Sequence, residues 1–116
     1  MKSLITETQI EQWRKIENFV ESQFGKKPDM QAILFLIGVQ ELGQGFRQFS
    51  KEEKQDLMHI AICRVLHPAG YYHLEGQDQD GWPHWKPTEK IPHLNFFEQE
   101  GLLKLHIIQY FEDEIW

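Results

Sequence analysis

The stretch DMQAILFLIGVQEL, from Asp29 to Leu42, decides the fold. Residues 32–39 are apolar or glycine without a break, and a helix that is apolar on every side belongs in a protein core. The run is far shorter than the roughly 20 residues that a membrane-spanning helix needs. A buried strand is the alternative, because the periodicity of an apolar run does not separate the two. We predict a buried helix over residues 30–42, because the run is long for a strand and Asp29 is a good N-cap.

Three further segments carry the start signals of helices. In each, a capping residue is followed three positions later by glutamine or glutamate, the pattern of a capping box at a helix start. In the first of them, apolar residues then recur at spacings of three and four, which makes one apolar stripe. We predict helices over residues 6–24, 51–66 and 96–113, with the capping pairs Thr6 and Gln9, Ser50 and Glu53, and Asn95 and Glu98.

The segment between the last two predicted helices, residues 68–94, is rich in proline, glycine and aromatic residues. A structureless segment of this length is uncommon in a compact domain, so it is either functional or contains short elements of its own. A hairpin is one alternative, with strands at residues 71–75 and 82–86 around a turn at 76–81. We predict an all-α fold, in which residues 1–116 form one compact four-helix domain with this long ordered loop.

Composition narrows the class of protein. The chain has 116 residues and a formal net charge of −6, and its only adjacent basic residues are the pairs Arg14 and Lys15, and Lys26 and Lys27. A nucleic-acid-binding protein normally presents a basic face, so we exclude that class. The single cysteine rules out an internal disulfide and fits a reducing compartment. The N-terminal residues lack the apolar region of a signal peptide, so we expect a cytoplasmic protein that does not enter a membrane.

The best candidate metal ligands are His59, Cys63 and His67, which stand four residues apart on one flank of the third predicted helix. The outer two are separated by about 12 Å of helix rise, so the three side chains do not reach one ion together. A site would need His73 or Glu75 from the loop. We predict no metal, with Cys63 as a small buried residue. The acidic stretch 78–81 lacks the other ligands of a calcium loop, and we interpret it as a turn.

Aromatic and histidine residues of the long loop make up the candidate binding site. Tryptophan and tyrosine combine an apolar ring with a polar tip, which suits both a ligand pocket and a loop that is pinned to a helical core by its own side chains. We find no motif for nucleophilic catalysis and predict no catalytic residue and no cofactor. The residues that we assign to ligand binding are His67, Tyr72, His73, Trp82, His84 and Trp85.

The last predicted helix is apolar around nearly its whole circumference. Either a second copy of the chain or the long loop covers the extra apolar surface. We therefore expect an interaction or scaffold module that forms a homodimer and binds a protein partner. The alternative is a small-molecule or metal-binding protein, or a hydrolase, with its site where the loop meets the third helix. Closed packing of the loop tryptophans favours the first function, and a pocket into which histidines converge favours the second.

Overall fold

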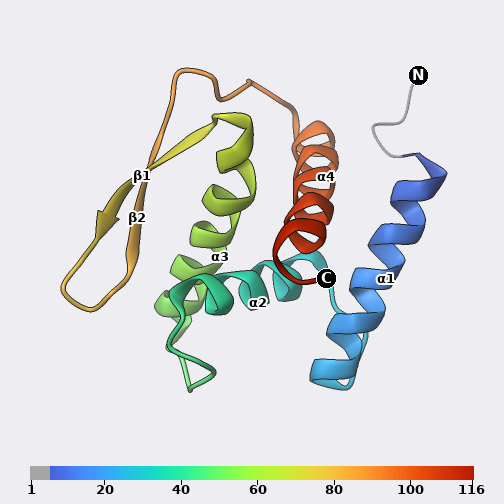
Figure 1. Ribbon diagram of the computed structural model, residues 1–116, viewed down its shortest axis with the longest axis horizontal. Helices are drawn as coiled ribbons and strands as arrows, with labels where there is room; N and C mark the ends of the chain where they lie inside the picture. The colour runs from blue at the N-terminus through green and yellow to red at the C-terminus, as the bar shows by residue number, and fades with distance from the viewer. Residues whose placement is uncertain (1–5) are drawn as a thin grey trace. The chain divides into compact units, whose positions relative to one another are not determined.

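The computed structural model describes residues 6–116, except for the side chains at positions 96 and 97. It contains the helices α1 (Glu7–Phe24), α2 (Met30–Leu42), α3 (Lys51–Leu66) and α4 (Phe96–Glu114), as Figure 1 shows. These bounds confirm the four predicted helices to within one residue at each end. The three predicted capping boxes and the Asp29 N-cap are also confirmed. None of the helices in the described residues combines the length and apolar character that crossing a bilayer requires.

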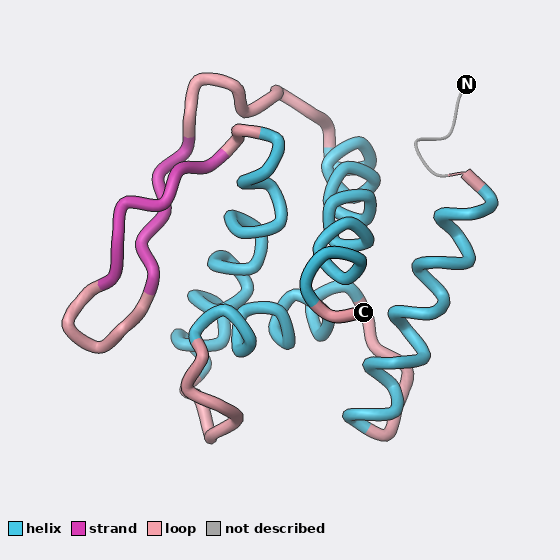
Figure 2. The backbone as a smooth tube through the Cα atoms, in the orientation of Figure 1, coloured by secondary structure: helices cyan, strands magenta, loops and turns pink. Residues whose placement is uncertain are grey.

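The prediction of an all-α fold is wrong, because the segment after α3 forms a two-stranded antiparallel sheet. A short 3-10 helix (His67–Ala69) leads into β1 (Tyr72–Gln77), which pairs with β2 (Pro83–Pro87). The strands are the magenta segments in Figure 2. The hairpin alternative was therefore the right one, with each strand starting one residue later than predicted. A bulge at residues 74–76 shifts the register of the sheet.

Contacts within the chain divide it into two units. The first consists of the described residues up to Pro28 together with Pro92–Trp116, and it contains α1 and α4. The second is Asp29–Ile91, which contains α2, α3 and the β1–β2 hairpin. That the whole chain folds as one domain stays a prediction.

Aromatic side chains join α1 to the C-terminal part of the first unit. The ring of Phe19 meets the rings of Phe111 and Trp116 edge to face, with centroids 6.2 and 5.2 Å apart. The ammonium group of Lys15 lies 4.3 Å from the centroid of the Trp116 ring. Edge-to-face pairs of this kind add about 0.5–1.5 kcal/mol each to the burial of the rings, so they help to hold the two helices together.

In the second unit, α2 packs closely against α3. Gly38 of α2 lies so near to Leu57 of α3 that a Cβ atom at position 38 would overlap the Leu57 carbonyl group. The missing side chain is therefore what permits this approach. Arg64 of α3 also forms an ion pair with Glu41 of α2, with 3.3 Å between Nε and Oε1. The residues of α2 that are buried are Ile33, Leu34, Ile37, Gly38, Val39 and Leu42. The predicted buried helix is thus confirmed, and its strand alternative is wrong.

A compact apolar cluster lies where α2, α3 and the hairpin meet. Its buried members are Val39, Leu42, Phe49 and Leu57, and the partly buried rings of Phe35 and Trp82 pack against them. Because Trp82 immediately precedes β2, this cluster attaches the hairpin to the helices. A two-stranded hairpin is at best marginally stable alone, so this attachment helps to keep it folded.

Candidate ligand-binding cleft

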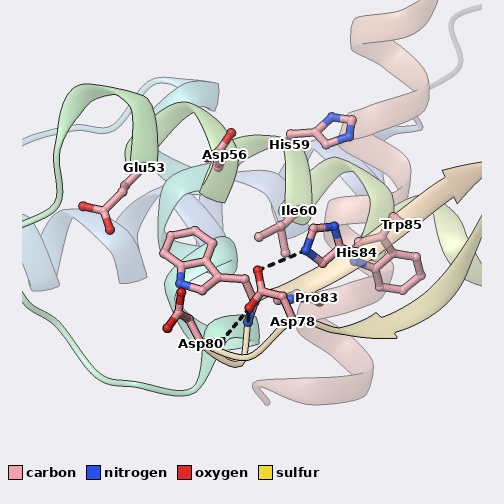
Figure 3. A pocket seen from close by; sticks show the side chains of 10 residues that line it. Glu53, Asp56, His59, Ile60, Asp78, Asp80, Pro83, His84 and Trp85 are labelled. Carbon is pink, nitrogen blue, oxygen red and sulfur yellow. Dashed lines mark hydrogen bonds and ion pairs between the residues drawn. The ribbon is translucent and has the colours of Figure 1, made fainter.

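A cleft of about 470 Å³ lies between α3 and the hairpin, entirely within the second unit. Its helical wall is formed by Glu53, Asp56, His59 and Ile60 of α3. Its other wall is formed by Asp78, Asp80, Trp82, Pro83, His84 and Trp85, and Figure 3 shows the side chains of both walls. Pockets of about 300–1,000 Å³ are typical of small-molecule sites, so the cleft has a suitable size.

Helical periodicity produces the α3 wall. Glu53, Asp56 and Ile60 are spaced by three and four residues, which brings them onto one flank of the helix. Glu53 also belongs to the capping box, where its Oε1 accepts a hydrogen bond of 2.9 Å from the backbone N–H of Ser50. This hydrogen bond holds the pKa of the Glu53 carboxyl below its ordinary value. Its second oxygen lies 3.6 Å from the Arg47 guanidinium, so Glu53 already has a cationic partner.

The turn of the hairpin is organised by Asp78. Its Oδ1 accepts hydrogen bonds from the backbone N–H groups of Asp80 and Trp82, at 2.9 and 3.0 Å, and Gly81 takes the left-handed conformation with φ of 84°. Its other oxygen, Oδ2, lies 3.0 Å from Nε2 of His84. The hydrogen bond with His84 is the main reason why the pKa of Asp78 lies below its ordinary value. The interpretation of residues 78–81 as a turn is confirmed.

Two indole rings line the cleft, and each is held in place by contacts with different residues. Trp82 packs against the apolar cluster, so its position is fixed by the helices. The ring of Trp85 lies 5.3 Å from the ring of His67, measured between centroids. His67 in turn bonds to the hairpin through its Nδ1, which lies 2.8 Å from the carbonyl oxygen of Tyr72. The indole N–H of Trp85 is buried and has no acceptor in the described part of the chain.

The cleft has a strong excess of negative charge. Of the lining residues in the described part of the chain, four carry a carboxylate and none is a lysine or arginine. Glu53 has Arg47 as a partner and Asp78 has His84. By contrast, no hydrogen bond or ion pair joins the carboxylate of Asp56 or Asp80 to another residue within 6–116, and both residues are exposed. Two carboxylates of the cleft are therefore free to bind a ligand.

Three of the six predicted site residues, Trp82, His84 and Trp85, line the cleft. The other three do not line it: His67 and Tyr72 lie at the base of the hairpin, and His73 is exposed on β1. The four carboxylates of the cleft were not among the predicted site residues. The spacing of Glu53 and Asp56 on α3 was the available signal, but it is also the ordinary pattern of a solvated helix surface.

The predicted candidates for metal ligands have structural roles. Cys63 is fully buried, its Sγ lies 3.5 Å from Nε2 of His59, and burial raises the pKa of its thiol to about 12. A metal ligand is a thiolate, which this environment strongly disfavours. No group of three or more histidine, cysteine, aspartate or glutamate residues within the described chain is arranged to hold a metal ion. The burial predicted for Cys63 is confirmed.

Comparisons with known proteins give no relative: no protein-family model, curated protein or solved structure matches this chain. The function must therefore be argued from the cleft itself.

Proposed function

We propose that this protein binds a small organic cation in the cleft between α3 and the hairpin. The observation that carries the proposal is the composition of the cleft: four carboxylates and two indole rings line about 470 Å³, and none of the described lining residues is a lysine or arginine. The two histidines, His59 and His84, come from opposite walls. Convergence of histidines on a pocket is the feature that favours a small-molecule-binding protein over a closed interaction module.

Each part of the lining suits one part of such a ligand. A cleft lined by charges of one sign concentrates its electric field and raises the local concentration of oppositely charged ligands. A cation beside the face of an indole gains roughly 0.5–2 kcal/mol, and the apolar body of the ligand is sheltered from water by the indoles, Ile60 and Pro83. An anionic ligand would meet four carboxylates and is therefore disfavoured.

Two expectations from the sequence belong to the proposal. A cytoplasmic location is supported by the lone cysteine, which has no partner for a disulfide. A homodimer is supported by large apolar side chains that are at least 40% exposed, among them Phe46 at 60% and Ile10 at 48%. Exposed apolar surface favours association with a second chain.

Calorimetric titration with hexylamine, hexanol and hexanoate tests the proposal, because these compounds share one apolar body and differ in charge. Hexylamine should bind at least tenfold more tightly than the other two, and raising the salt concentration should weaken it. The double variant Asp56→Asn/Asp80→Asn should lose at least tenfold in affinity for hexylamine. The matched control is Glu75→Gln, which removes a charge from the exposed face of β1 outside the cleft. Equal binding of hexanol or hexanoate, or no binding of hexylamine, contradicts the proposal.

A further inference from the structure

We infer that the ligand is a dication, in which two amino groups are joined by an aliphatic spacer, as in a diamine or polyamine. The inference rests on the proposed binding of an organic cation and adds the number and spacing of its charges. Three observations support it: two carboxylates of the cleft already have partners, the two unpaired carboxylates lie on different walls, and apolar side chains line the cleft as well.

The contacts within the cleft leave two carboxylates without a hydrogen-bonding or ion-pair partner. Glu53 lies 3.6 Å from the Arg47 guanidinium and accepts the Ser50 N–H, so it is occupied within the chain. Asp78 is occupied by the His84 ring and by two backbone N–H groups of the turn. Asp56 and Asp80 have no such partner within the described chain, and a ligand with one positive charge would leave one of them unmatched.

The two unpaired carboxylates stand on different walls of the cleft. Asp56 belongs to α3, and Asp80 belongs to the turn between β1 and β2. Figure 3 shows Asp56 near the top and Asp80 near the bottom of the view, and Ile60 lines the same cleft. The indole of Trp82 also lines the cleft. A ligand that contacts both carboxylates must therefore carry its charges at its two ends and present an apolar middle to these side chains.

A divalent metal ion is the other dication to consider, and the geometry disfavours it. Calcium needs six to eight oxygen ligands at about 2.3–2.6 Å, and magnesium needs a tight octahedron. No three histidine, cysteine, aspartate or glutamate residues of the described chain come close enough to hold one ion. The carboxylates are thus dispersed around the cleft, which suits two separated charges better than one concentrated charge.

The test compares 1,6-diaminohexane with hexylamine by calorimetry at constant ionic strength. The wild-type protein should bind the diamine at least tenfold more tightly, well beyond the twofold advantage that two identical ends give statistically. Either Asp56→Asn or Asp80→Asn alone should remove this preference, so that the two amines bind within about threefold of each other. Glu75→Gln should retain the full preference, and circular dichroism should show that all three variants are folded.

The outcomes separate this inference from the proposed function. Equal affinity of the wild-type protein for the two amines overturns the dication and leaves the binding of an organic cation intact. Failure of both amines to bind overturns both. A preference for the diamine that survives both aspartate substitutions also overturns the inference, because other groups would then recognise the second charge. Stoichiometric binding of calcium or magnesium, lost in Asp56→Asn, would show that a metal is the dication instead.

Discussion

Substitution of Gly38 by alanine should destabilise the protein strongly, although alanine is the better helix former. A Cβ atom at position 38 would overlap the carbonyl oxygen of Leu57, and it would lie 2.6 Å from the carbonyl carbon and 2.9 Å from Cβ of that residue. The two nearest atoms belong to the backbone of α3. They move only if the whole helix moves, so no change of side-chain rotamer relieves the overlap.

The expected loss can be worked out from two opposing terms. Alanine is favoured over glycine in a helix by about 1 kcal/mol. Overpacking of a core costs about 1–3 kcal/mol, and the upper figure applies here because backbone atoms are in the way. The net loss is about 2 kcal/mol. With an entropy of unfolding of about 2.1 cal/mol/K per residue, this lowers the Tm of a 116-residue chain by about 8 °C.

Urea unfolding followed by far-UV circular dichroism measures this loss, and a thermal melt measures the shift in Tm. Gln40→Ala is the matched control, because it introduces the same residue at an exposed position of α2 and should change stability by at most about 0.5 kcal/mol. Leu57→Ala should not rescue the variant, since alanine keeps the carbonyl group and the Cβ atom that a side chain at position 38 would meet. A Gly38→Ala protein as stable as the wild type would refute the close approach of α2 and α3.

Three further predictions concern titration, reactivity and assembly. Burial lowers the pKa of His106 below its ordinary value of 6.5, so on acidification this histidine is protonated in the unfolded chain before it is protonated in the folded one. The free energy of unfolding should therefore fall as the pH is lowered from 7 to 5. His106→Gln should remove most of that pH dependence. Burial raises the pKa of Cys63 to about 12, so its thiol should react with a disulfide reagent only after unfolding; fast reaction of the native protein would contradict this. Sedimentation at micromolar concentration should show a dimer, and a monomer throughout that range would exclude self-association.

The bounds of the helices could be predicted closely because their ends are determined by interactions between residues that are close in sequence. A capping residue and its partner lie three positions apart, so both are visible in a short stretch of sequence. Gly25 and Gly43 adopt left-handed conformations just after α1 and α2 and end these helices. Because glycine is the residue that most often takes this conformation, both helix ends are recognisable in the sequence.

The hairpin was harder to predict because its signals conflict. β2 begins and ends with proline, and Gly76 lies inside β1, although both residue types are usually unfavourable in strands. Pairing survives because Asp78 organises the turn and the base of the hairpin is tied together by Thr88. The Thr88 hydroxyl donates to the Gly70 carbonyl oxygen at 2.6 Å, and its backbone N–H donates to the Tyr71 carbonyl oxygen at 3.0 Å. These contacts join residues 17 and 18 positions apart, beyond the range of local pattern analysis.

The candidate site was only half predictable for the same reason. Tryptophans and histidines are conspicuous in a loop, so Trp82, His84 and Trp85 were identified from the sequence. A carboxylate on an exposed helix is inconspicuous, and Asp56 becomes part of a cleft only because the hairpin folds back beside α3. Asp80 lies 24 positions further along the chain, so no spacing rule connects it with Asp56.

Anchoring of the hairpin and binding in the cleft depend on different side chains, and this decides which substitutions are informative. Trp82 lines the cleft but also packs against the apolar cluster of α2 and α3, so its removal would release the hairpin and destroy the cleft with it. Asp78 likewise holds the turn through two backbone N–H groups. No hydrogen bond or ion pair joins the side chain of Asp56 or Asp80 to another residue of the described chain. Loss of binding on their conversion to asparagine would therefore report on the charge that meets the ligand, and not on the folding of the hairpin that carries it.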